Sequence, residues 1–170
     1  MSTQHKKYCL DANVLIRAWE EYYAPKFCID YWKVLDELGA EGRIFLPEKV
    51  YEEITRTDDD LTNWLKKSKI PEYKIDGHVI ECLKKIYAKD PAHKNLVDNI
   101  KNRSLADPWV IAHALNQGAI VVTKEEKVTA ANTTKIKIPN VCDNMGVRWI
   151  NDFQFVEELN IQFSCHITLL

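Results

Sequence analysis

The 170-residue sequence contains few of the features that mark specialised protein classes. Its five glycines and six prolines are too few for a collagen-like or low-complexity chain. Its apolar runs, such as residues 119–122, are far shorter than the roughly 18 residues that a membrane span needs. The N-terminal residues contain no apolar segment typical of a secretory signal. We therefore expect a globular protein of the cytoplasm with no membrane segment.

The sequence also lacks a cysteine motif for metal binding or redox chemistry. Its five cysteines are odd in number, and no two have the C-x-x-C spacing. We expect these thiols to be reduced. Neither sign of charge dominates, because 23 Lys and Arg residues face 25 Asp and Glu residues, giving a net charge of −2. This balance neither indicates nor excludes nucleic-acid binding, since an acidic metal site would offset basic residues elsewhere.

Short apolar segments alternate with segments of helical periodicity. We predict strands at residues 7–10, 43–46, 119–123, 135–138 and 147–150. We predict helices at residues 14–21, 27–39, 105–117, 139–145 and 152–159, with a further helix opening at Pro47. Asn13 is the candidate N-cap of the helix at residues 14–21. This alternation indicates an α/β fold whose parallel sheet is covered by helices on both faces.

The chain length fits a single domain over residues 1–170. Residues 58–103 are rich in charge, and we expect two or three helices there, broken near Pro71 and Pro91. The tail, at about residues 160–170, alternates only weakly between apolar and polar side chains, and its pattern predicts no element.

Two acidic residues follow predicted strands. Asp11 comes after the strand at residues 7–10, and Glu125 comes after the strand at residues 119–123. In parallel sheets, ligands bind beyond the carboxyl ends of the strands. Asp11 alone is equally well explained as a turn or capping residue. Glu126, one residue beyond Glu125, is expected to be exposed.

Two further acids belong to predicted helices. Asp107 precedes Pro108, and because proline favours the first helical position, Asp107 is a natural N-cap. Glu53 flanks the face of its helix that is predicted to be buried, whereas Glu52 points nearly the opposite way. A capping residue and a solvent-exposed charge are the alternative interpretations, and a cap can still bind metal through its free oxygen.

The four acids are more informative together, because all are predicted to lie at the same edge of the sheet. Clustered carboxylates repel one another, which raises their pKa values, and a divalent cation relieves that repulsion. Ligand sets made only of oxygen favour Mg²⁺ or Mn²⁺ over zinc. Such a metal can activate water and neutralise charge on a phosphodiester.

These acids and their surroundings resemble the PIN-domain family over roughly residues 7–150. The resemblance is carried, in order and spacing, by residues 10–16, 47–54, 106–114 and 121–125. Residues 138–142 and 146–148 are further similar to a prokaryotic PIN-like branch with no assigned role. The resemblance implies a three-layer α/β/α sandwich around a central parallel sheet. It also implies a metal-dependent ribonuclease, as in toxins of the VapC type, whose acids bind Mg²⁺ or Mn²⁺.

Position by position, the resemblance makes Asp11, Glu53 and Asp107 the three core acids. Glu125 corresponds to the fourth acid, which is usually aspartate, so the resemblance leaves open whether Glu125 binds metal directly or through a water. Asn13 corresponds to a polar residue that often follows the first acid. Thr123 corresponds to the hydroxyl residue before the fourth acid.

The resemblance also implies partners, namely an RNA substrate, an inhibitory antitoxin protein and a second copy of the chain in a homodimer. Basic residues near the motifs are candidates for binding the substrate, and we select Arg17, Lys124 and Arg103. DNA is not excluded as a substrate.

Two other classes of protein compete with a ribonuclease. A haloacid-dehalogenase-type phosphatase also has an aspartate after its first strand, but it needs a second acid two residues later, where this chain has Asn13. A non-catalytic PIN-like module that binds RNA or protein is the stronger rival. Thermal stabilisation by Mn²⁺ would separate this module from an active nuclease.

Overall fold

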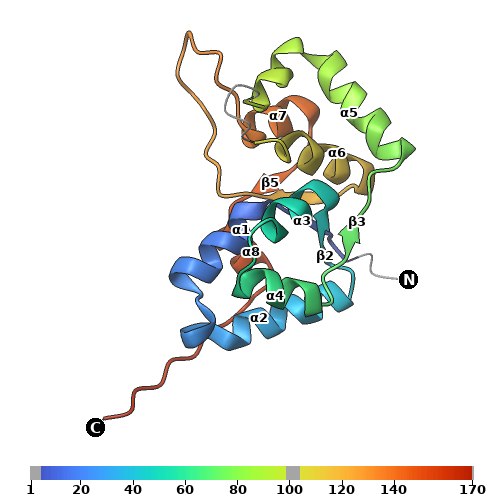
Figure 1. Ribbon diagram of the computed structural model, residues 1–170. Helices are drawn as coiled ribbons and strands as arrows, with labels where there is room; N and C mark the ends of the chain where they lie inside the picture. The colour runs from blue at the N-terminus through green and yellow to red at the C-terminus, as the bar shows by residue number, and fades with distance from the viewer. Residues whose placement is uncertain (1–4, 99–103, 170) are drawn as a thin grey trace.

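The computed structural model describes residues 5–98 and 104–169 (Figure 1). Five parallel strands form one sheet in the order β3–β2–β1–β4–β5. The strands are β1 (Tyr8–Leu10), β2 (Ile44–Pro47), β3 (Glu72–Tyr73), β4 (Ile120–Val122) and β5 (Trp149–Ile150). The predicted α/β fold with a parallel sheet is therefore confirmed.

The helices connect and cover these strands. In chain order they are α1 (Ala12–Arg17), the π-helical turn η1 (Ala18–Tyr22), α2 (Pro25–Ala40), α3 (Glu48–Thr55), α4 (Asp60–Lys67), α5 (Gly77–Lys89), the 3₁₀ helix η2 (Pro91–Leu96), α6 (Asp107–Gln117), α7 (Ile138–Met145) and α8 (Asp152–Glu158). None of the helices in the described ranges is long and apolar enough to cross a membrane.

The helices form two layers with the sheet between them (Figure 1). On one face α5, α6 and α7 contact one another, and α6 contacts β1, β2 and β4. On the other face α2 and α3 contact β2, and α8 packs the ring of Phe155 edge-on against Tyr8 of β1 at 5.2 Å. The three-layer α/β/α sandwich implied by the resemblance is confirmed.

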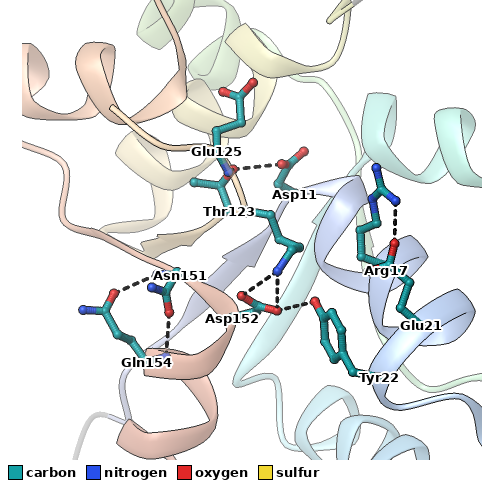
Figure 2. Close-up of polar contacts among 10 residues, drawn as sticks. Asp11, Arg17, Glu21, Tyr22, Thr123, Glu125, Asn151, Asp152 and Gln154 are labelled. Atoms are coloured by element: carbon teal, nitrogen blue, oxygen red, sulfur yellow. Dashed lines mark hydrogen bonds and ion pairs between the residues drawn. The ribbon is translucent and has the colours of Figure 1, made fainter. Parts of the chain in front are cut away.

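Side chains at the helix ends explain several boundaries. The carboxylates of Asp59 and Asp76 accept hydrogen bonds from backbone N–H groups in the first turns of α4 and α5. Asn151 and Gln154 form a reciprocal capping box at the start of α8, which Figure 2 shows. Gly118 ends α6 with a φ of 59°, a left-handed conformation that favours glycine. The chain then turns directly into β4, as the sequence predicts.

The central strands place the candidate site. β1 and β4 are neighbours, with Leu10 opposite Val122, and every residue of both strands is buried. The chain leaves both strands at the same edge of the sheet. The backbone N–H of Asp11 still donates to the carbonyl of Val122 at 3.0 Å, so Asp11 continues the pairing of β1 with β4.

Three local predictions are wrong. Residues 135–137 form no strand, and Ile138 already begins α7. Asp11, rather than Asn13, occupies the N-cap of α1, and its side chain caps no backbone N–H. Asp107 is the first residue of α6, with Ala106 at the N-cap. The two-residue strand β3, within the segment expected to be helical, is not predicted from the sequence.

The C-terminal tail forms neither helix nor strand over residues 160–169. It is nevertheless attached to the domain by aromatic contacts. Phe163 stacks on Tyr23 with ring centroids 4.9 Å apart and an interplanar angle of 12°. Tyr23 in turn contacts the buried ring of Tyr31 in α2 at 4.4 Å. The weak sequence pattern of the tail thus hides a specific contact with α2.

Candidate active site

Asp11 and Thr123 occupy equivalent positions directly after β1 and β4, and they contact each other. The hydroxyl of Thr123 donates a hydrogen bond of 2.9 Å to the Asp11 carboxylate (Figure 2). Asp11 is 3% exposed and Thr123 is fully buried. The pairing of two predicted site residues follows from the parallel register of their strands, which brings two carboxyl ends to one point.

Glu125 is held from two sides. Its backbone N–H donates to the Thr123 hydroxyl at 3.1 Å, which connects it to Asp11 (Figure 2). Its carboxylate accepts a 2.9 Å hydrogen bond from the backbone N–H of Ile138, and it lies 3.5 Å from the Nζ atom of Lys137. The fourth acid is therefore oriented by the N-terminus of α7. Its neighbour Glu126 is exposed, as predicted.

Asp107 reaches the same region from the first turn of α6. Its side chain is 9% exposed and borders a cavity of about 610 Å³, which Glu125 and Ser104 also line. The Ser104 hydroxyl forms a hydrogen bond with the Asp107 carboxylate that favours its ionised form. The helix start near Pro108 thus presents Asp107 to the site, although Asp107 does not act as the N-cap.

Glu53 lies on α3 as the helical geometry predicts. Its side chain is half-buried, whereas Glu52 is exposed. Burial raises the pKa of Glu53, and the nearby Arg56 partly opposes that rise. The negative charge of Glu53 contributes to the raised pKa values of both Asp11 and Asp107, so Glu53 lies within electrostatic range of both.

The two buried aspartates resist ionisation. The pKa of Asp11 is raised to about 7, mainly by burial and further by the charges of Glu125 and Glu53. The pKa of Asp107 is raised to about 8, first by burial and then by the negative charges of Asp11, Glu125 and Glu53. Each aspartate therefore responds to the other acids, which is the electrostatic signature of a carboxylate cluster without a compensating cation.

The donor set suits a hard divalent cation. The four acids offer only carboxylate oxygens as ligands. The hydroxyl oxygen of Thr123 lies beside Asp11, and that of Ser104 lies beside Asp107. Within residues 5–98 and 104–169, no three Asp, Glu, His or Cys side chains lie close enough to hold one metal ion together. Mg²⁺ does not require three, because it usually keeps several waters and binds one or two carboxylates. Asp11 and Asp107 fit that pattern.

The predicted basic residues differ in their surroundings. Arg17 is exposed and forms an ion pair of 2.6 Å with Glu21 (Figure 2). Lys124 places its ammonium group 3.0 Å from the buried carboxylate of Asp152. Arg103 lies outside the described residues. The exposed Asn13 borders a second cavity, of about 530 Å³, together with Arg17, Lys124 and Glu125.

Three residues near the site were not predicted from the sequence. Lys137 borders both cavities, Ser104 is bonded to Asp107, and Asp152 binds the Lys124 ammonium group. The similarity of residues 138–142 to a PIN-like branch was the only sequence signal close to Lys137. The contact between Lys124 and Asp152 joins residues 28 positions apart, and no local pattern reveals it.

Comparison with solved structures agrees with this architecture. The chain superposes on the VapBC2 complex from Rickettsia felis, solved bound to a DNA fragment from its promoter, with a TM-score of 0.54 and 14% identity, covering 85% of this chain and 97% of that chain. It also matches FitAcB from Neisseria gonorrhoeae with a TM-score of 0.49 and 15% identity, covering 86% of this chain and 98% of that chain. No curated protein sequence matches the chain.

The sheet order and the layers, together with the likeness to VapBC2, agree with the fold that the resemblance to PIN-domain proteins implies. A family profile described as a domain of unknown function, DUF4411, matches residues 8–163. The chain therefore belongs to the DUF4411 family. Because the match extends beyond β5 and α8, it includes the tail residue Phe163, which stacks on Tyr23.

Proposed function

We propose that the protein is a metal-dependent ribonuclease that hydrolyses RNA phosphodiester bonds in the cytoplasm. The observation that carries the proposal is the pair of buried aspartates, Asp11 and Asp107, whose pKa values are raised to about 7 and about 8 by burial and by neighbouring acids. A protein maintains such unfavourable charges where a cation will neutralise them. Their position at the carboxyl edge of the sheet is where ligands bind in this type of fold.

In this proposal Asp11 and Asp107 would hold Mg²⁺ or Mn²⁺, and Glu53 and Glu125 would act on the same site through their charges. The metal supplies an activated water and neutralises charge on the phosphate. Side chains of the protein orient the carboxylates and accept the proton. The Thr123 hydroxyl fixes the orientation of the Asp11 carboxylate, and the half-buried Glu53 takes the proton of the attacking water. Glu125, held by the Ile138 N–H, acts through a water.

The same proposal includes regulation by a partner. The similarity to VapBC2 supports the proposal that the chain is the toxin of a toxin–antitoxin pair and that an antitoxin protein is its partner. A homodimer remains part of the proposal. Of the four acids, Glu125 lines cavities of about 530 and 610 Å³ and Asp107 lines the second of them, which leaves these two side chains accessible to an RNA strand and to an inhibitor.

Cleavage of a panel of labelled RNAs and single-stranded DNAs tests the proposal. Wild type is compared with Asp11→Asn in Mn²⁺, in Mg²⁺ and in EDTA. We expect wild type to cleave RNA only with metal and Asp11→Asn to be inactive in every condition. Full activity in Asp11→Asn, or undiminished activity in EDTA, would overturn the assignment of the site.

Two pairs of adjacent glutamates provide matched controls, because one member of each pair faces the site and the other is exposed. We expect Glu53→Gln and Glu125→Gln to lower the cleavage rate by about 10- to 100-fold, the range seen when residues that support a metal site are removed. Glu52→Gln should retain the wild-type rate, and Glu126→Gln, which changes the lining of the 530 Å³ cavity but not the acids of the site, should lose much less than Glu125→Gln. Equal losses within a pair would contradict the assigned geometry.

A non-catalytic PIN-like module that binds RNA or protein is the second candidate. It is favoured by the carboxylate of Glu125, which is already occupied by the Ile138 N–H and by Lys137. Thermal unfolding with increasing Mn²⁺ distinguishes the two candidates. A nuclease site gains stability with metal concentration through linkage, and Asp11→Asn abolishes the gain. A module without a metal site shows no metal-dependent stabilisation in either protein.

A further inference from the structure

The cations around the acids differ in how firmly they are already paired. Arg17, Lys124 and Lys137 all line the 530 Å³ cavity. Lys124 is bonded to both oxygens of the buried Asp152 at 3.0 and 3.2 Å, whereas Arg17 donates a 2.6 Å hydrogen bond to Glu21 in an exposed ion pair. The Nζ atom of Lys137 lies 3.5 Å from Glu125, with 45% of its side chain exposed. An exposed pair at that distance contributes little stability and is readily exchanged.

Lys137 also differs from Arg17 and Lys124 in its position. It borders both the cavity shared with Asn13 and the cavity shared with Asp107, and Glu125 is the other residue that borders both. A chain that passes from one cavity to the other must therefore pass the Glu125–Lys137 pair. Asp11 and Asp107 are only 3% and 9% exposed, so a polymer must be flexible enough to approach carboxylates that lie below the surface.

The position of Lys137 is fixed by its backbone. Its N–H donates to the side-chain oxygen of Asn140 at 3.2 Å. Asn140 also accepts a hydrogen bond from the N–H of Val128 at 3.1 Å and donates one to its carbonyl at 2.9 Å. Three hydrogen bonds from one side chain thus close the loop of residues 128–137 at its base. Ile138, the next residue, binds the Glu125 carboxylate, so the same turn places both Lys137 and Glu125.

We propose that Lys137 binds a phosphate of single-stranded RNA at the junction of the two cavities, and that Asn140 positions it there. This inference rests on the proposed function and names the residue by which that site recognises its substrate backbone. A lysine ammonium group is a compact cation suited to a phosphate oxygen. When the acids bind a cation, Glu125 loses its need for Lys137, and the phosphate becomes the better partner.

The test uses Lys137→Gln and the matched variant Lys127→Gln, which removes an equal charge just before the same loop. Lys127 is paired with Asp143 and borders neither cavity. Binding of a labelled single-stranded RNA is measured by fluorescence anisotropy over a range of salt, with Asp11→Asn as background to prevent turnover. Loss of one phosphate contact lowers the slope of log affinity against log salt by about 0.7 for a single strand. We expect this loss for Lys137→Gln, and a slope near that of the background for Lys127→Gln.

A second readout separates substrate binding from damage to the metal site. In the wild-type background, Lys137→Gln should keep or increase the thermal stabilisation by Mn²⁺ alone, because the change removes a cation beside the acids. Its KM for RNA should rise about tenfold with a smaller change in kcat. Lys137→Arg should recover much of the affinity, and Asn140→Ala should resemble Lys137→Gln in KM.

The outcomes distinguish this inference from the proposed function. If wild type cleaves RNA and Lys137→Gln matches Lys127→Gln in slope and KM, the role of Lys137 is overturned and the nuclease stands. Loss of Mn²⁺ stabilisation in Lys137→Gln would overturn the role as well, because it would show a purely structural effect through Glu125. A dependence on Lys137 seen only with single-stranded DNA or duplex RNA overturns the assigned substrate. A wild type that binds no RNA overturns both proposals.

Discussion

Two buried aspartates, Asp11 and Asp152, lie just beyond the carboxyl ends of strands of the same sheet, yet their surroundings are opposite. Both are almost inaccessible, at 3% and 2% exposure. Asp152 accepts hydrogen bonds from the Lys124 ammonium group and from the Tyr22 hydroxyl (Figure 2). Asp11 has the Thr123 hydroxyl as its side-chain donor and is otherwise influenced by the charges of neighbouring acids.

The comparison teaches that burial of a charge does not by itself mark a functional site. The signs of the surrounding charges distinguish the two cases, because a buried acid with a cation is neutralised, whereas buried acids beside one another either hold protons or need a cation. Lys124 separates the two regions. It lies in sequence between Thr123 and Glu125, but its ammonium group binds Asp152, and it sits over the rings of Tyr22 and Phe153 at 4.9 and 5.2 Å. It therefore leaves the acidic site without a neutralising cation from this segment.

The largest effect on stability is expected at the paired aspartate. Asp152→Asn leaves the ammonium group of Lys124 without its counter-charge, and breaking a buried pair in this way costs about 3 kcal/mol of unfolding free energy. Lys124 retains 26% side-chain exposure, which keeps the cost at the low end of the usual range. Urea unfolding at pH 7 measures the loss.

Glu21→Gln, which breaks the exposed ion pair with Arg17, is the control for Asp152→Asn. We expect it to cost less than about 1 kcal/mol. Equal costs for the two variants would mean that the buried pair of Asp152 and Lys124 contributes no more stability than an exposed ion pair.

In metal-free protein, replacing Asp11 by asparagine is expected to raise the unfolding free energy, which is the opposite of the effect of Asp152→Asn. Its folded pKa of about 7 lies above the ordinary 3.8, so the folded state holds a proton that the unfolded state has released. Stability from this group is complete below about pH 4 and is lost as the pH rises through 7. Wild type should therefore lose about 2–3 kcal/mol between pH 5 and pH 8 that Asp11→Asn does not lose.

Unfolding in EDTA at pH 5 and pH 8 measures that difference, which includes the part of the raised pKa of Asp107 that the charge of Asp11 causes. With excess Mn²⁺ at pH 8 the order should reverse, because only wild type keeps both aspartates of the metal site. A constant difference between the two proteins across this pH range would contradict the raised pKa of Asp11.

A third buried ionisable group extends the comparison, because among the described residues it is neither paired with an opposite charge nor part of the acidic cluster. His113 of α6 is 1% exposed, and neither of its ring nitrogens has a hydrogen-bond partner among the described residues. Burial lowers its pKa from 6.5 to about 4. The unfolded chain therefore gains a proton before the folded one, and stability is lost as the pH falls from about 6.5 to about 4.

This loss amounts to about 2 kcal/mol between pH 7.5 and pH 5, and His113→Leu should abolish it. The exposed His78→Gln variant is the control and should keep the wild-type pH dependence. The difference in unfolding free energy between the two pH values measures the effect. If His113→Leu retains the full loss at acid pH, another group carries it.

Sequence patterns were sufficient for the parts of the molecule that depend on local order. Buried strands followed directly by acids revealed β1 with Asp11 and β4 with Glu125. Helical geometry separated Glu53 from the exposed Glu52. These inferences succeed because strand and helix periods are properties of neighbouring residues.

Other features depend on distant residues and could not be predicted. The alternation at residues 135–138 is typical of a strand, but the side chain of Asn140 binds the Lys137 N–H and the loop closes into a helix instead. The strand β3 has only two residues, too few for a pattern. The role of Asp152 depends on Tyr22, 130 positions earlier in the chain.

The hydrogen bonds of Asn140 have a consequence for how this protein can change in evolution. Because one side chain closes the base of the loop, residues 129–134 can vary in length and composition without moving Glu125 or the start of α7. These residues are exposed and make no helix or strand. We therefore expect that this loop can be exchanged for one of another length or sequence while the acids stay in place.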